Sequence, residues 1–304
     1  MVEVQIMADG LRFPEGPVAM ADGSVILGEI AGAAVTRIAR DGSKSPIGRA
    51  GGGPNGLATG PDGALYVCNN GGNEYAQGGF LSTGPAKDYR GGYIQRIDPR
   101  SGAARVLYGE CNGHRLSAPN DIVFDRQGGF YFTDLGKRRA RDRDHGGVYY
   151  ALPDGSWISE LVYPMLSPNG VGLAPDEKTL YVADTESSRL FAFDIEAAGR
   201  LRTEPFPAPF GGRLVCGLPG YQRFDSLAVA ASGNIAVATL ITGRITVIAP
   251  DGRVVRQVEM PDVYPTNICF GGADMKTAYV TLSATGRLAA MDWPEPGLRL
   301  NFMA

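Results

Sequence analysis

Phe13-Pro14-Glu15-Gly16-Pro17 is the first of six related stretches that recur along the chain. The other five are Gly53-Pro54-Asn55-Gly56-Leu57, Ala118-Pro119-Asn120-Asp121-Ile122, Ser167-Pro168-Asn169-Gly170-Val171, Arg223-Phe224-Asp225-Ser226-Leu227 and Tyr264-Pro265-Thr266-Asn267-Ile268. A run of small or apolar residues, a turn and a strand-like run follow each copy. The third residue of every copy has a hydrogen-bonding side chain, and in five of the six it can offer a metal an oxygen.

The spacing of these copies predicts the architecture. Their third residues are at positions 15, 55, 120, 169, 225 and 266, so one unit takes about 50 residues, the size of a four-stranded propeller blade. No segment carries a convincing helical stripe, which disfavours an α/β fold, and a β-helix would need shorter repeats. We therefore predict an all-β, six-bladed β-propeller that forms a single domain over residues 1–304. The alternating segment Val2–Ile6 is expected to be the N-terminal strand that closes the last blade.

Two long insertions interrupt the repeats. Asn69–Gly91 is rich in Gly, Asn and Tyr, and a structureless loop of this length is usually functional or mobile. Leu135–His145 is highly charged. Its charged residues are Lys137, Arg138, Arg139, Arg141 and Arg143 against Asp142 and Asp144. Such a run is most often a solvated loop, but on the face of a metal site it would favour anionic substrates.

Composition and charge exclude several classes of partner. The net charge is −3, so no global field draws the protein to nucleic acid or to an anionic membrane. No segment approaches the roughly 18 uninterrupted apolar residues of a membrane span, and the first residues lack the features of a signal peptide. The four cysteines stand far apart, as free thiols of a reducing compartment do. We expect a cytoplasmic protein that binds neither nucleic acid nor membrane.

The repeat phase predicts a metal site. In a propeller, equivalent positions of different blades lie at one height around the axis, so the third residues of the first five copies should converge. They are Glu15, Asn55, Asn120, Asn169 and Asp225. Two carboxylates with several amide carbonyls suit Ca²⁺, or less exclusively Mg²⁺ or Mn²⁺. Zn²⁺ is a further alternative, although only two histidines are present. The competing interpretation is that Pro-Asn-Gly and Pro-Glu-Gly are only turns.

Other catalytic motifs fail on their context. Gly51–Gly56 matches a dinucleotide-binding pattern but precedes a strand, so no helix N-terminus is available for a phosphate. No G-x-S-x-G or H-E-x-x-H sequence occurs. His114 and Arg115 precede Asn120 closely enough to reach the mouth of the same channel and bind substrate. The alternative interpretation is that both residues lie in a solvent-exposed loop and bind nothing.

Taken together, these stretches resemble the SMP-30/gluconolactonase/luciferin-regenerating family over essentially the whole chain. The residues that carry the resemblance are Phe13–Pro17, Pro119–Asp121, Ser167–Gly170, Leu180–Asp184, Phe224–Val229 and Phe270–Asp274. The resemblance implies a divalent cation, usually calcium, in the central channel, with Glu15, Asn169 and Asp225 as its ligands. Asn120 matches a position that binds metal in some members and substrate in others.

Two departures from the family pattern bear on specificity. Many members have Asp-Gly where this chain has Asp225-Ser226, a change that leaves the carboxylate intact. The sugar-lactonase members have Arg where this chain has Ala118. Arg115 is a candidate substitute.

The resemblance implies hydrolysis of a small lactone to a hydroxy acid. The cation would polarise the carbonyl, Asp225 would act as general base, and Asn120 would help to hold the carbonyl oxygen. Asn55, Arg115 and His114 are the expected substrate contacts. The alternatives are a phosphotriesterase of the diisopropylfluorophosphatase type and a non-catalytic calcium-binding propeller.

Overall fold

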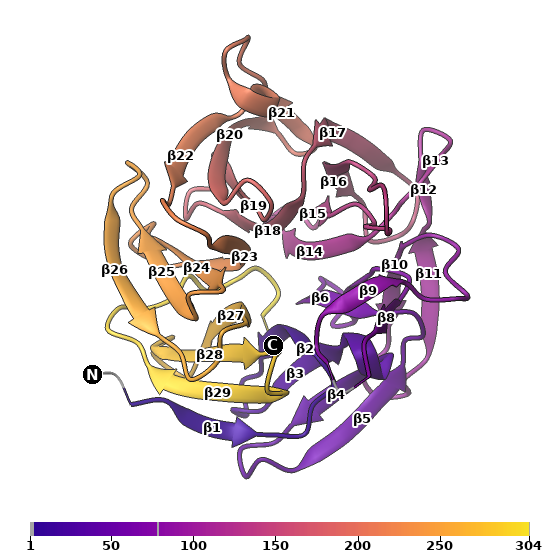
Figure 1. Ribbon diagram of the computed structural model, residues 1–304, viewed down its shortest axis with the longest axis vertical. Coiled ribbons are helices and arrows are strands. Elements are labelled where there is room, and N and C mark those ends of the chain that lie inside the picture. Colours follow the sequence, from indigo (N-terminus) through magenta and orange to yellow (C-terminus); the bar gives the residue numbers. More distant parts are fainter. Residues whose placement is uncertain (1–2, 78, 304) are drawn as a thin grey trace.

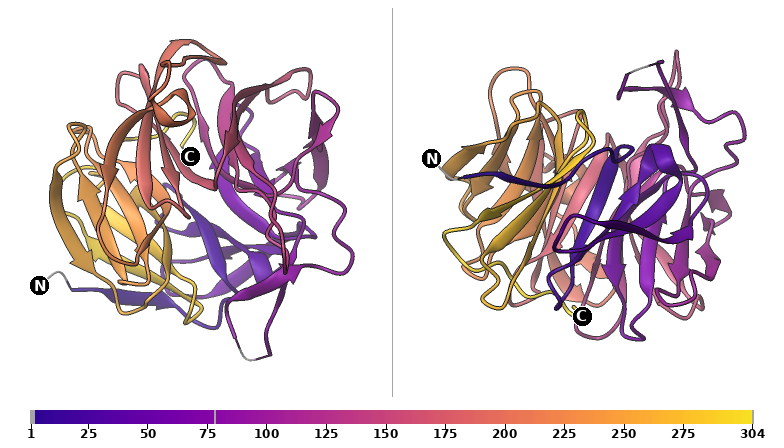
Figure 2. Two further views of the ribbon diagram at one scale, coloured as in Figure 1. Left: turned by 45° about the horizontal axis from the view of Figure 1, so that its top comes forward. Right: turned by 90° about the horizontal axis from the view of Figure 1, so that it is seen from below.

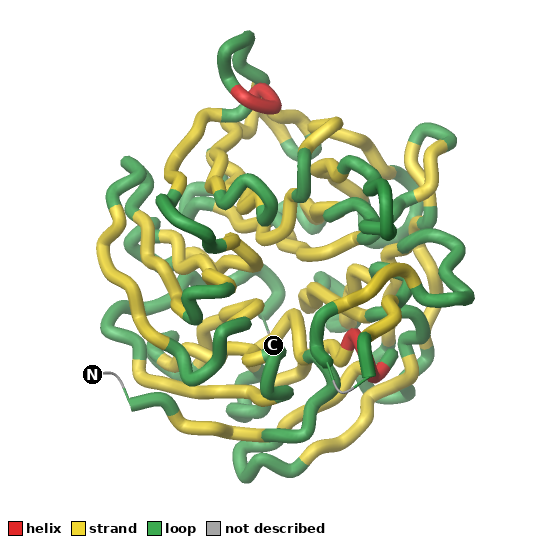
Figure 3. Tube along the Cα trace, viewed as in Figure 1, coloured by secondary structure: helices red, strands yellow, loops and turns green. Residues whose placement is uncertain are grey.

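The computed structural model describes residues 3–77 and 79–303. Six antiparallel sheets stand around a central axis, as Figure 1 shows, and the predicted six-bladed β-propeller is confirmed. Strands and loops make up nearly the whole trace in Figure 3. In the described ranges the helical elements are two 3₁₀ turns, Ile30–Gly32 and Pro209–Gly211.

Each blade begins with a copy of the motif as its innermost strand. These strands are β2 (Pro14–Ala19), β6 (Pro54–Thr59), β14 (Pro119–Phe124), β18 (Pro168–Leu173), β23 (Arg223–Val229) and β27 (Pro265–Gly271). Innermost strands of neighbouring blades contact one another all around the axis, including β27 with β2. The third residues of the motif copies are therefore held around one channel.

The remaining strands follow outward in each blade. The second strands are β3 (Val25–Glu29), β7 (Leu65–Asn69), β15 (Phe130–Asp134), β19 (Thr179–Asp184), β24 (Ile235–Leu240) and β28 (Thr277–Leu282). The third strands are β4 (Ala34–Ile38), β10 (Tyr93–Ile97), β16 (Gly146–Ala151), β20 (Arg189–Ala197), β25 (Arg244–Ile248) and β29 (Arg287–Asp292). The outermost strands are β5 (Lys44–Arg49), β11 (Ala104–Tyr108), β17 (Ile158–Met165), β22 (Arg213–Gly217), β26 (Val254–Glu259) and β1 (Gln5–Ala8).

The core lies between the blades. Six apolar clusters each join the facing sides of two neighbouring blades, including the last and the first. The inner strands are covered on both faces, so β6 and β14 are buried throughout, whereas β5 and β26 are largely exposed. This explains why the inner strands read as continuous apolar and small-residue runs rather than as alternating patterns.

The N-terminal strand closes the ring, as predicted, because β1 pairs with β29. Its position differs from the expected Val2–Ile6, since the strand is Gln5–Ala8 and Val2 lies outside the described residues. Within this strand Ile6 is 43% exposed, whereas Ala8 is buried. A register shift between Ile6 and Ala8 reverses the alternation at that point.

A second departure concerns the insertions. Part of Asn69–Gly91 forms the two-stranded sheet β8 (Asn73–Tyr75) and β9 (Ser82–Pro85), so this segment is not a structureless loop. Figure 2 shows the purple hairpin standing out from one face of the ring.

A smaller hairpin, β12 (Glu110–Cys111) with β13 (His114–Arg115), precedes β14. The fourth blade gains a fifth strand, β21 (Arg200–Arg202), which pairs with β20 beside β22.

The four cysteines are free; Cys68 and Cys111 are buried, and Cys216 and Cys269 are partly exposed. Among the described residues, no helix has the length and apolar character needed to cross a bilayer.

Candidate active site

An irregularity of the innermost strands directs the motif side chains. In every blade the register between the first and second strands shifts within the motif, for example between Glu15 and Val18 and between Phe224 and Leu227. The same shift occurs in the other four blades. Such bulges re-aim side chains beside functional sites. Here they accompany a set of polar side chains that faces the channel.

The structure brings five motif residues together on the wall of one cavity of about 760 Å³. They are Glu15, Asn55, Asn120, Asn169 and Asp225, from five different blades. Each is between 3% and 7% exposed. The sixth motif residue, Thr266, is buried and is not among the described residues that line this cavity. Its hydroxyl group is hydrogen-bonded to those of Thr281 and Ser283.

The two carboxyl groups of this set perturb each other. Burial raises the pKa of Glu15 to about 7, although the Gly16 N–H and the Asn267 side-chain amide donate to its Oε2 at 3.0 and 3.2 Å. Burial, together with the Glu15 carboxylate, raises the pKa of Asp225 well above its usual range. Both charges are therefore unfavourable in this place unless a proton or a cation accompanies them.

The amide groups supply oxygens that lack partners. Asn55 Oδ1 and Asn120 Oδ1 are buried, and neither has a hydrogen-bond partner within residues 3–77 and 79–303. Asn169 is oriented by two contacts: its Nδ2 donates to Thr185 Oγ1 at 3.0 Å, and Ser226 Oγ donates to its Oδ1 at 3.2 Å. Orphaned buried oxygens are costly, and an oxygen-seeking cation would satisfy them. The residues present thus fit a hard divalent cation.

Amide oxygens are essential to such a site in this chain. Nowhere in the described part of the chain do three or more His, Cys, Asp and Glu side chains gather as a potential metal cluster. A cation here would depend on two carboxylates completed by asparagine side chains. This donor set suits Ca²⁺ or Mg²⁺ better than a metal that selects nitrogen or sulfur.

A third buried carboxyl group, Asp121, was not singled out by sequence reasoning. It is 7% exposed, it accepts hydrogen bonds from the Ile122 and Val171 amides at 3.0 and 3.4 Å, and burial raises its pKa to about 7. Its charge also raises the pKa values of Glu15 and Asp225. The available signal was the third motif copy, which has Asp121 where three other copies have glycine.

The outer part of the cavity is formed largely by loops. Apolar side chains of this rim include Leu81, Tyr221, Ile241 and Val263, which are between 38% and 71% exposed. The β8–β9 hairpin of the second blade reaches the sixth blade, since the rings of Phe80 and Tyr264 lie 5.1 Å apart. Tyr75 lines the cavity and its ring is 5.8 Å from that of Phe13.

One residue of the charged insertion is not solvated, contrary to the usual behaviour of such a run. Lys137 is 3% exposed and lines the cavity. Its Nζ donates to the carbonyl oxygens of Asn70 and Gly72, both at 2.7 Å, and lies 4.7 Å from the centre of the Tyr89 ring. Burial lowers its pKa to about 7. Lys137 thereby ties the insertion of the third blade to the base of the β8–β9 hairpin.

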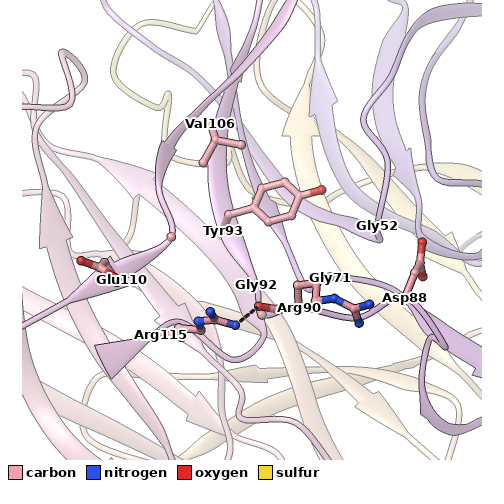
Figure 4. Close-up of a pocket in the computed structure, with 11 residues that line it drawn as sticks. Gly52, Gly71, Asp88, Arg90, Gly92, Tyr93, Val106, Glu110 and Arg115 are labelled. Atoms are coloured by element: carbon pink, nitrogen blue, oxygen red, sulfur yellow. Dashed lines mark hydrogen bonds between the residues drawn. The ribbon is translucent and has the colours of Figure 1, made fainter. Parts of the chain in front are cut away.

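The structure places His114 and Arg115 away from these residues. Both are exposed on the β12–β13 hairpin, and neither is among the described residues that line the central cavity. Arg115 instead lines a separate cavity of about 450 Å³, together with Arg90, Tyr93 and Glu110, as Figure 4 shows. Its Nη1 donates to the Arg90 carbonyl oxygen at 3.0 Å. Ala118, by contrast, does line the central cavity.

Comparison with known proteins shows which family the chain resembles in sequence. The SMP-30/Gluconolactonase/LRE-like region family matches residues 13–284. Lactonase drp35 of Staphylococcus saprophyticus is 32% identical over 200 residues, which cover 66% of this chain and 54% of that protein. The chain thus spans about half of that relative's length. Gluconolactonase of Zymomonas mobilis is 25% identical over 309 residues, covering 92% of this chain and 79% of the relative.

Two solved structures illustrate the similarity in three dimensions. A gluconolactonase from Xanthomonas campestris has a TM-score of 0.76 at 25% identity, covering 96% of this chain and 90% of that one. The calcium-binding protein regucalcin from Agrobacterium tumefaciens has a TM-score of 0.75 at 17% identity, with 98% of each chain covered. At this identity the second likeness concerns the fold alone.

Proposed function

Because the chain belongs to the SMP-30/gluconolactonase/LRE-like family, we propose that it is a hydrolase that opens a small lactone to its hydroxy acid in the central cavity. The observation that carries this proposal is the set of buried oxygen donors on the cavity wall. Two of these oxygens have no partner among the described residues, and two carboxyl groups there have raised pKa values. Perturbed carboxyl groups in a cavity are typical of functional sites.

Four residues would hold a divalent cation, for which Ca²⁺ is our first expectation. They are Glu15, Asn120, Asn169 and Asp225. The bound cation would supply Lewis-acid polarisation of the lactone carbonyl. Ser226 and Thr185 fix the amide of Asn169 with its Oδ1 on the Ser226 side, so that this ligand is oriented before binding.

Asp225 is the proposed general base. Its carboxylate lines the cavity among the residues that would hold the cation, so it would face the water that attacks the acyl carbon and would accept its proton. The ring carbon–oxygen bond of the acyl group then breaks, and the proton held by Asp225 passes to the departing alkoxide. One water is consumed and a hydroxy acid is formed. The side-chain amide of Asn120 would hold the carbonyl oxygen. Asn55, which lies on the neighbouring blade, would contact the substrate.

The test removes one charge at a time without changing side-chain size. Glu15→Gln and Asp225→Asn are expected to lose measurable calcium binding by calorimetry and elemental analysis. Hydrolysis of gluconolactone and dihydrocoumarin should fall by about 100-fold or more in both variants, because Asp225→Asn removes the general base and Glu15→Gln removes a carboxylate that would hold the cation. Asp41→Asn is the matched control, because Asp41 is exposed in a hairpin turn where its Oδ1 accepts the Ser43 N–H.

Three outcomes would contradict the proposal. If both variants keep the metal content and the lactone turnover of the unaltered protein, the ring of oxygen donors is not the active site. If a fluorophosphate is hydrolysed and no lactone is, the site is a phosphotriesterase of the diisopropylfluorophosphatase type. If neither substrate turns over while calcium still binds, the protein is a non-catalytic propeller.

A further inference from the structure

One wall of the central cavity carries arginines from separate blades that share a single carboxylate. Arg143 belongs to the insertion of the third blade, and Arg223 begins β23 of the fifth blade. Their guanidinium groups lie 3.5 and 3.1 Å from the two carboxylate oxygens of Glu186 in the fourth blade. The three side chains are between 23% and 29% exposed, and all three line the cavity.

This wall has an excess of positive charge. Outside the ring of oxygen donors, the basic residues that line the cavity are Lys137, Arg138, Arg143 and Arg223, against the single acid Glu186. Guanidinium groups stay protonated at any physiological pH. Even with Lys137 neutral, three positive charges therefore face one negative charge. In a chain whose net charge is −3, this excess is a local feature.

The two guanidinium groups are held in place and keep donors to spare. Arg143 donates from Nη2 to the Leu135 carbonyl oxygen at 3.2 Å and from Nε to that of Asp144 at 3.5 Å. Arg223 lies 5.7 Å from the centre of the Tyr221 ring. Each guanidinium group has five N–H donors, more than these contacts use. A fixed fork of this kind suits a carboxylate.

The position of Arg223 relates this wall to the reacting centre. Residues 223 and 225 are two apart on one strand, so both side chains face the cavity while Phe224 between them is fully buried. The strand rise separates their backbone positions by about 7 Å. A five- or six-membered lactone with an acidic substituent is of this size. Its carbonyl would lie beside Asp225 and its acidic group beside Arg223.

We propose that the substrate is a lactone that bears a carboxylate substituent, and that Arg143 and Arg223 bind this substituent. The inference rests on the proposed lactonase function. Two guanidinium groups partly neutralised by Glu186 leave one surplus positive charge, which matches a singly charged carboxylate. A neutral sugar lactone would leave this charge without a partner.

The experiment compares two lactones that differ in this one group. They are 5-oxotetrahydrofuran-2-carboxylate and γ-valerolactone, which has a methyl group in the same place. The measured quantity is the ratio of their kcat/KM values in the holoprotein. Arg223→Gln and Arg143→Gln, which lie on different blades, should each lower this ratio about tenfold, the usual effect of losing a charge-assisted hydrogen bond. The loss should appear mainly in KM.

Arg202→Gln is the matched control, because Arg202 pairs with Asp194 on the exposed edge of the fourth blade, away from the residues that line the cavity. It should leave the ratio unchanged. If the ratio stays the same in Arg223→Gln and Arg143→Gln although the lactones are hydrolysed, the carboxylate inference is overturned and the lactonase proposal stands.

A binding measurement separates the two failures. The ring-opened products are 2-hydroxyglutarate and 4-hydroxyvalerate, which differ by the same carboxylate. Calorimetry should show at least tenfold tighter binding of 2-hydroxyglutarate, and Arg223→Gln should remove this preference. If neither these lactones nor gluconolactone and dihydrocoumarin are hydrolysed but the preference is present, the anion site stands and the lactonase proposal fails. Equal binding of both products would overturn the anion site.

Discussion

Single glycines in the motif tie the candidate site to the packing of the blades. A Cβ atom on Gly16, whose φ is +55°, would lie 2.2 Å from the carbonyl oxygen of Asn55 in the next blade. A Cβ on Gly170 would lie 2.8 Å from the Asp225 carbonyl oxygen. The glycine after one site residue thus touches the backbone of the next site residue. Its absence of a side chain serves close approach rather than only a turn.

Gly16→Ala should therefore destabilise the protein by about 2–4 kcal/mol, since overpacking adds to the cost of a positive φ. The measurement is the free energy of unfolding from urea titration. The dependence of this free energy on urea concentration should be the same in the variant and the unaltered protein. Gly63→Ala is the matched control, because Gly63 also has a positive φ, +73°, but open space around its Cβ position. It should cost only about 1 kcal/mol. Equal losses in the two variants would mean that close approach at Gly16 is unimportant.

At this scale the sequence predicted the positions of the channel side chains but not their surroundings. Repeat phase alone was enough to bring Glu15 and Asp225 to one cavity. It could not reveal the contact of Arg223 with Glu186, because this contact joins the first residue of β23 to the turn between β19 and β20 of the preceding blade and depends on the length of that turn. For the same reason Arg115 was expected near Asn120, whereas the β12–β13 hairpin directs it to another cavity.

Among the elements, the β8–β9 hairpin borders the outer part of the cavity. It lines the rim with residues 80–84 and meets Tyr264 of the sixth blade through Phe80. Its base is fixed by Lys137, whose ammonium group binds two of its carbonyl oxygens. The contact from the neighbouring insertion thus adds to the aromatic contacts of Phe80 and Tyr75 that hold the hairpin.

Lys137→Met should loosen this hairpin, because it keeps the apolar stem and removes the donors to Asn70 and Gly72. Hydrogen exchange of residues 69–91 should become about tenfold faster, as expected when two buried carbonyl groups lose a charged partner. Lys87→Met is the control, since Lys87 is in the same insertion with its side chain 92% exposed and only a 3.9 Å contact with Glu74. Unchanged exchange in Lys137→Met would show that this contact does not hold the hairpin.

The sequence foresaw the regular strands better than this hairpin. The inner strands were visible as apolar runs after each motif copy. The strands Asn73–Tyr75 and Ser82–Pro85 are short and contain Asn, Ser, Gly and Pro, residues that usually indicate loops. They form a sheet in a segment that residues of other blades hold in place, such as Lys137 and Tyr264. The sequence of the segment itself does not indicate these contacts.

For the whole molecule, the pairing of β1 with β29 joins the first described segment to the last blade. Deleting residues 1–8 should lower the midpoint of thermal unfolding while leaving a single transition, because the last blade loses its outermost strand and exposes an edge. Ile6→Ala is the control, since it keeps the strand and truncates a side chain that is 43% exposed; it should lower the midpoint much less than the deletion does. If the deletion variant unfolds at the same midpoint as the full-length protein, closure by β1 does not stabilise the ring.

Closure by β1 also bears on the order in which the protein folds. Gln5 pairs with Ala290, so nearly the whole chain must be in place before this contact can form. Bringing such distant segments together has an entropic cost that grows with the length of chain between them. Blades with local connections can form first, and proteins dominated by distant contacts fold slowly. During synthesis, the N-terminal strand must therefore wait for the sixth blade before it finds its partner.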